Sequence, residues 1–116
     1  MKNLTAILLA IVLLASCKKE KDELIGTKWT ANDEFAHIFW GGKCTNSVEF
    51  LTATTCQGID NWSNGSYIKA TQGTYKHWGD SISWTIETKT IKGKISGSII
   101  LSDYWDLGSN RVYTKE

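Results

Sequence analysis

Apolar and polar residues alternate in short stretches along most of the chain after residue 24. The clearest stretch is Ile82–Ile86, in which Trp84 and two isoleucines are separated by Ser83 and Thr85. Successive side chains of a strand point to opposite faces of a sheet, so this period of two predicts a strand with one buried face. Similar patterns predict further strands at residues 26–30, 35–40, 47–53, 73–78, 95–101 and 111–113, with residues 67–69 either a separate short strand or part of the next one.

Glycine and polar residues separate these stretches, and Gly79-Asp80 is typical of a tight hairpin turn. The chain has ten glycines and no proline. Residues 57–65 read as a long polar loop, and no helical period appears after residue 24. Seven or eight short strands with frequent turns predict an all-β fold, a small antiparallel meander closed into a β-barrel. A β-sandwich is the alternative.

The first residues read as an export signal. Lys2 precedes an apolar run over residues 4–15, which is long enough for a signal peptide and too short to span a bilayer. The following Leu14-Ala15-Ser16-Cys17 resembles the lipobox of bacterial lipoproteins. That resemblance implies cleavage before Cys17 and a membrane anchor through lipid on its thiol. The expected organisation is a signal peptide at 1–16, the lipidated cysteine and a tether at 17–23, and one β-barrel domain at 24–116.

The tether, residues 18–23, consists entirely of charged residues and predicts a solvated spacer. Lys18 stands where an aspartate would retain a lipoprotein at the inner membrane of enterobacteria. The run also resembles the tag with which Bacteroidetes display lipoproteins on the cell surface, and a plain charged linker explains it equally well. The expected location is the bacterial outer membrane, with exposure at the cell surface as one of two orientations.

Charge and cysteine count limit the expected partners and cross-links of the chain. Lysine and arginine number 13 against 12 acidic residues, and Lys2 leaves with the signal peptide, so the exported part is neutral and nucleic acid is not an expected partner. Of three cysteines, Cys17 is assigned to the lipid. Cys44 and Cys56 remain as an even pair in an oxidising compartment, which favours a disulfide over free thiols. No metal site or cofactor is expected.

The domain is similar to small lipocalin-like lipoproteins of Bacteroidetes. Three short motifs carry the resemblance: Gly26-x-x-Trp29, Gly73-Thr74-Tyr75 before a Gly-Asp hairpin, and the terminal Tyr113-Thr114-Lys115. The resemblance implies a barrel with a binding or structural role. In lipocalins a late arginine packs on the tryptophan of the first strand, which implies a contact of Arg111 with Trp29; a solvated arginine is the alternative.

Tryptophan supplies the candidate site. Several tryptophans lie beside turns, and turns of a meander alternate between the two ends of a barrel. With residues 67–69 as a separate strand, Trp62, Trp78 and Trp105 share one end; with 67–69 merged into the next strand, Trp78 and Trp105 share an end with Trp40. Indoles beside acidic residues suit a sugar ring or a partner protein; tryptophans that plug the barrel ends are the alternative. The candidate ligand-binding residues are Trp62, Trp78, Asp80, Asp103, Trp105 and Asp106.

Catalytic motifs are weak. His77 with Asp80, and Asp103 with Asp106, have the residue types of an acid–base pair, but polar turns explain them as well. We therefore expect a non-catalytic, lipid-anchored module that binds a small ligand, a glycan or a protein partner. A structural or accessory subunit of an envelope assembly is the alternative, and a small hydrolase-type enzyme is the third reading.

Overall fold

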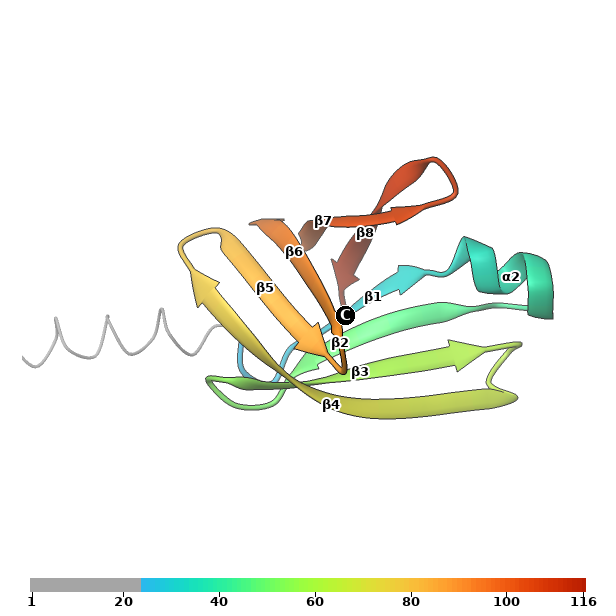
Figure 1. The fold of residues 1–116 in the computed structure, drawn as a ribbon, viewed down its shortest axis with the longest axis horizontal. Coiled ribbons are helices and arrows are strands. Elements are labelled where there is room, and N and C mark those ends of the chain that lie inside the picture. Colours follow the sequence, from blue (N-terminus) through green and yellow to red (C-terminus); the bar gives the residue numbers. More distant parts are fainter. Residues whose placement is uncertain (1–23) are drawn as a thin grey trace, which may run out of the picture.

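The computed structural model describes residues 24–116, which form one closed antiparallel β-barrel with a single short helix (Figure 1). The predicted signal peptide, Cys17 and the tether lie outside the described residues. The elements in chain order are β1 (Lys28–Asn32), α2 (Glu34–Trp40), β2 (Thr45–Phe50), β3 (Thr55–Trp62), β4 (Tyr67–Trp78), β5 (Ser81–Ile86), β6 (Lys89–Ser96), β7 (Ile99–Asp106) and β8 (Ser109–Lys115).

Each strand pairs with its neighbours in the chain, and β8 returns to pair with β1. The closing register places Trp29 opposite Lys115 and Thr30 opposite Thr114. Closure leaves no unpaired sheet edge, which a chain without proline would otherwise have to protect. The predicted small meander barrel is confirmed, and the alternative of a β-sandwich is wrong.

The meander gives the barrel two distinct ends. Helix α2 lies at one end together with the β3–β4, β5–β6 and β7–β8 turns, and we call this the α2 end. The start of β1 and the β2–β3, β4–β5 and β6–β7 turns lie at the opposite end. Figure 1 shows α2 and the tips of the β3–β4 and β7–β8 hairpins projecting in the same direction.

Apolar side chains fill the barrel away from the α2 end. Phe50 contacts Tyr75 with ring centroids 4.6 Å apart, and Trp84 meets Tyr113 edge-on at 5.3 Å. Trp84 and Phe50 are almost completely buried. Edge-on and tilted pairs of this kind add to the stabilisation that burial itself supplies. This half of the interior is therefore a packed core, and it holds Trp29 and Trp84 as strand tryptophans.

Helix α2 corrects the prediction of a strand at 35–40. Asp33 caps the helix, because its carboxylate accepts a hydrogen bond from the Ala36 backbone N–H at 2.9 Å. Gly41 ends it with a positive φ of 69°, and its N–H donates to the His37 carbonyl. Ala36 is the only helix residue whose side chain is buried. A run of large apolar residues at these positions is thus a solvent-exposed helix and not a core strand.

Two further boundaries differ from the predictions. The predicted loop at 57–65 is mostly strand β3. Residues 67–69 belong to the long strand β4, which confirms the alternative in which they are part of the next strand. The predicted single strand at 95–101 is instead a hairpin: β6 ends at Ser96, Gly97 takes a φ of 60° in the turn, and β7 begins at Ile99. Gly97 is therefore a turn residue and not a bend within a strand.

The predicted Cys44–Cys56 disulfide is also corrected, because both cysteines are free and buried. Cys56 lies opposite Phe50 in the β2–β3 pair, whereas Cys44 precedes β2 at the other end of that strand. Six residues of strand span roughly 20 Å, and a disulfide needs Cα atoms within about 7 Å. Burial raises the pKa of the Cys56 thiol to about 11, so this cysteine is an unreactive core residue.

Candidate functional site

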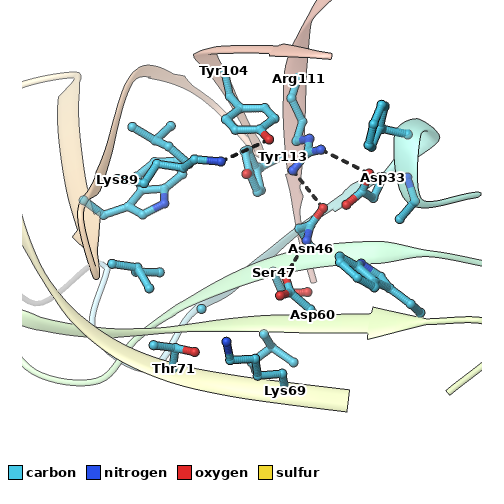
Figure 2. A pocket seen from close by; sticks show the side chains of 18 of the residues that line it. Asp33, Asn46, Ser47, Asp60, Lys69, Thr71, Lys89, Tyr104, Arg111 and Tyr113 are labelled. Atoms are coloured by element: carbon cyan, nitrogen blue, oxygen red, sulfur yellow. Dashed lines mark hydrogen bonds and ion pairs between the residues drawn. The ribbon is translucent and has the colours of Figure 1, made fainter. Parts of the chain in front are cut away.

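The interior of the barrel is hollow at the α2 end. A cavity of about 410 Å³ opens there, and its walls come from β2, β3, β4, β6, β7, β8 and α2 (Figure 2). Trp84 and Tyr113 of the packed core form its apolar floor. The side walls above this floor carry charged and aromatic residues. A concave site with a few convergent polar groups is the usual form of a small-molecule site.

Arg111 anchors one wall of the cavity. It points inward from β8 and is only 8% exposed. Its Nη2 lies 2.9 Å from the Asp106 carboxylate and 3.5 Å from that of Asp33, while Nη1 donates to the Asn46 side chain at 2.8 Å. The guanidinium also lies over the Tyr104 ring, 4.3 Å from its centroid. Arg111 thus ties β8 to β2, β7 and the N-cap of α2 by charge-assisted bonds.

The guanidinium stays charged despite its burial. Burial by itself lowers the pKa of Arg111, but Tyr113 and the two carboxylates of Asp106 and Asp33 raise it, and the net pKa lies above its ordinary value. The resemblance to lipocalins implied a contact of Arg111 with Trp29. The aromatic partner is Tyr104 instead, and the alternative of a solvated Arg111 is equally wrong.

A second set of polar groups continues round the cavity. The Asn46 amide donates to the Asp60 carboxylate at 2.5 Å, and Lys69 forms an ion pair with Glu87 at 3.8 Å. Lys89 donates to the Tyr104 hydroxyl at 3.1 Å, and its ammonium lies 4.2 Å from the centre of that ring. Among residues 24–116, neither Lys89 nor Asp60 forms an ion pair. The cavity therefore presents one unpaired positive and one unpaired negative charge.

Two buried donors in the cavity wall lack an acceptor. Within the described part of the chain, the indole Nε1 of Trp62 and the Nε of Arg111 make no hydrogen bond. The Trp62 ring is held between Trp40, at a centroid distance of 6.5 Å, and Tyr67, at 5.2 Å. A buried donor without a partner costs free energy, so such groups call for a specific explanation.

The predicted tryptophan cluster is only partly present. Trp62 lines the cavity, and Trp40 and Trp105 lie at the same α2 end. Trp78 lies at the opposite end of the barrel, so its predicted neighbourhood with Trp105 is wrong. The reason is the hairpin at Gly97, which puts three strands rather than two between the two turns. Trp105 is 67% exposed and does not line the cavity.

The predicted acidic residues are scattered. Asp80 belongs to the opposite end and pairs with Lys94 at 3.4 Å. Asp103 is exposed and accepts from the Lys92 backbone N–H at 2.9 Å, whereas Asp106 is buried against Arg111. Asp103 and Asp106 therefore do not form a carboxylate pair. Asp106 does not line the cavity itself, but it pairs with Arg111, which does.

Neither histidine faces a carboxylate. His77 Nε2 lies 2.8 Å from the Gly79 carbonyl oxygen, and His37 Nδ1 lies 2.6 Å from that of Gly42. Both contacts hold turns, which agrees with the reading of His77-x-x-Asp80 as a polar hairpin end. In the described part of the chain, no three His, Cys, Asp or Glu side chains are placed to hold a metal ion.

Sequence reasoning missed most of the polar wall: Asp33, Asn46, Asp60, Lys69 and Lys89. Because their side chains are polar, they read as solvent-facing positions, although all but Asp33 share the inward face of a strand with apolar residues. The period of two along a strand could have identified some of the inward-facing polar residues. Asp60 stands four residues after the buried Cys56, and Arg111 stands two residues before the buried Tyr113, so each lies on the same face as a buried residue.

Comparisons of the chain with known protein families, with curated proteins and with solved structures found no match. A separate search of residues 24–116 for membrane-spanning helices found none that is long and apolar enough.

Proposed function

We propose that this chain is a non-catalytic binding module, held at the bacterial outer membrane by lipid on Cys17, which takes a small polar ligand in the cavity at the α2 end. The barrel supplies rigid walls, and the cavity has room for a small molecule. The observation that carries the proposal is that this cavity holds the charges of Lys89 and Asp60, neither of which forms an ion pair within residues 24–116. The anchor rests on the resemblance of residues 14–17 to a lipobox.

The arrangement suits binding better than catalysis. Arg111 pairs with the carboxylates of both Asp106 and Asp33, and these contacts hold the wall in shape. One ring nitrogen of each histidine contacts a backbone carbonyl in a turn. The groups that remain free to act on a ligand include the ammonium of Lys89 and the carboxylate of Asp60.

The Trp62 indole N–H provides a direct test by NMR. We expect its proton resonance, assigned by its disappearance in Trp62→Phe, to shift when a ligand enters the cavity that the Trp62 side chain lines. The full chain in neutral detergent would be titrated with O-phosphoethanolamine and with N-acetylglucosamine, as a charged and a neutral probe. The indole N–H of Trp78, at the other end of the barrel, is the internal control. A Trp62 resonance that neither probe shifts contradicts the proposal.

Mass spectrometry tests the anchor separately. Chain recovered from bacterial membranes should begin at Cys17 and carry the added mass of two or three acyl chains, as firm anchoring requires more than one. An uncleaved or unmodified N-terminus contradicts it.

A further inference from the structure

The α2 end is the most apolar surface of the barrel. In α2, Phe35 is 55% exposed, Ile38 64%, and Phe39 and Trp40 67% each. The two hairpins that project at this end, β3–β4 and β7–β8, also carry large exposed apolar side chains. We call these side chains together the apolar tips: Phe35, Ile38, Phe39 and Trp40 on α2, Tyr67 and Ile68 on the β3–β4 hairpin, and Trp105 and Leu107 on the β7–β8 hairpin.

The apolar tips surround a polar interior. Figure 1 shows the three projections at the same end of the barrel, and the cavity opens there, with Phe35 and Trp40 on its rim. Exposed apolar patches of this extent on a soluble domain mark an interaction surface. Tryptophan and tyrosine with large aliphatic side chains are the mixture found where protein meets the membrane interface.

The charges inside the cavity indicate what the apolar tips contact. Figure 2 shows Lys89 reaching in from β6 and Asp60 from β3, on different walls of one cavity. An apolar protein face would remove water from both charges without pairing either, which is costly. The occupant must combine an apolar part with a head group of both signs.

We propose that the α2 end docks on a lipid surface and that its cavity takes the head group of a zwitterionic phospholipid. This rests on the proposed function, since it names the ligand of the same cavity. The phosphodiester oxygens accept from the Lys89 ammonium, and the head-group ammonium lies against the Asp60 carboxylate. The acyl chains remain in the membrane, where the apolar tips contact them.

Brominated lipids test both halves of this proposal, because bromine on an acyl chain quenches only a tryptophan that reaches hydrocarbon. The full chain would be reconstituted into vesicles of phosphatidylethanolamine and phosphatidylglycerol in fixed proportion, with bromine on one lipid at a time. We expect brominated phosphatidylethanolamine to quench at least twice as strongly as brominated phosphatidylglycerol. The double variant Trp40→Phe/Trp105→Phe should lose most of this quenching. Trp78→Phe, which removes an exposed indole at the opposite end, should keep it.

A cavity variant tests the head-group contact. Lys89→Gln removes the unpaired positive charge and leaves the apolar tips unchanged, so the ratio of the two quenching strengths should fall to about one. Three results overturn the proposal: no quenching of Trp40 and Trp105, equal quenching by both lipids in the unmodified chain, or an undiminished ratio in Lys89→Gln. Pairing of two chains through the tips gives the first of these results.

Failure here is distinguishable from failure of the cavity as a binding site. If the vesicle results are negative while a soluble probe still shifts the Trp62 indole resonance, the lipid assignment is wrong and the proposed function stands. If the Trp62 resonance also responds to neither probe, both fall.

Discussion

At the scale of single residues, Arg111 holds the cavity together. It is the point where β8, β2, β7 and the start of α2 meet, through Asp106, Asn46 and Asp33. A buried ion pair of this kind contributes little relative to a well-packed apolar core. Removal of one partner is strongly destabilising, because the remaining charges stay buried without a charge of opposite sign.

We predict that Arg111→Ala lowers the free energy of unfolding by about 3–5 kcal/mol, because it leaves the Asp106 and Asp33 carboxylates buried and unpaired. Arg111→Lys should lower the free energy of unfolding by less, because its ammonium keeps the positive charge. It should still lower it, since one ammonium cannot match the planar fork of donors that reaches three partners. Urea-induced unfolding of the full chain measures both.

Lys94→Ala is the matched control for this prediction. It also removes a cation from an ion pair, with Asp80, but both side chains of that pair are about two-thirds exposed. Exposed pairs contribute less than about 1 kcal/mol. A loss in Arg111→Ala no larger than that in Lys94→Ala would show that Arg111 is not the structural anchor of the cavity.

At the scale of elements, the sequence predicted strands best where they face the packed core. The alternation of Ile82, Trp84 and Ile86 gave β5 correctly, because all three side chains point into that core. Strand β3 was missed for the opposite reason: Gly58 and Asp60 point into the polar cavity, so no apolar period marks it. Such a failure is expected where the inward side chains of a strand line a polar cavity, since these positions depart from the alternation of apolar and polar residues.

Helix α2 was missed on different grounds. Its apolar residues are consecutive and exposed, so they follow neither the period of a core strand nor that of an amphipathic helix packed on a core. The decisive local feature is Asp33, an N-cap residue that stands directly before the helix.

Two glycines allow a test of strand packing. A Cβ at Gly73 would collide with the backbone carbonyl oxygen of Thr85 on β5, so β4 and β5 would have to separate. A Cβ at Gly58 would meet only Cδ1 of Ile86, the far end of a flexible side chain. We predict that Gly73→Ala lowers the free energy of unfolding by about 2–3 kcal/mol, the range of core overpacking, and Gly58→Ala by less than about 1 kcal/mol.

Thermal and urea unfolding of the two variants side by side measures this difference. Both substitutions add the same methyl group to a strand residue, so each serves as the control for the other. Equal losses would mean that separating β4 from β5 costs no more free energy than moving the Ile86 side chain.

At the scale of the whole molecule, the barrel divides into a packed half and a hollow half. The sequence predicted the closed meander but not which turns share an end, because the strand count was wrong in three places: residues 34–40 are a helix, β3 was predicted as a loop, and the hairpin at Gly97 was predicted as one strand. Topology was therefore predictable from periodicity and turn residues, whereas the composition of the site depended on an exact strand count.

The packed half contains three weak acids, Cys56, Tyr75 and Tyr113, all nearly inaccessible to solvent. Burial raises the pKa of all three; for Cys56 the rise is from 9.0 to about 11, and for Tyr113 the nearby Arg111 offsets part of it. An acid whose pKa is higher in the folded than in the unfolded state stabilises the fold fully below the unfolded value. That contribution is lost as pH rises through the folded value.

We therefore predict that the barrel loses stability in alkali. Cys56 alone should lower the free energy of unfolding by about 2–3 kcal/mol between about pH 9 and pH 11, at 1.36 kcal/mol per pKa unit. Tyr75 and Tyr113 add to the decline in the same direction. Urea unfolding across this range measures the slope, and Cys56→Ala, although less stable at neutral pH, should show a shallower decline. An identical slope in the variant would mean that the Cys56 thiol ionises in the folded barrel as easily as in the unfolded chain, and that the packed half is not closed to water at that position.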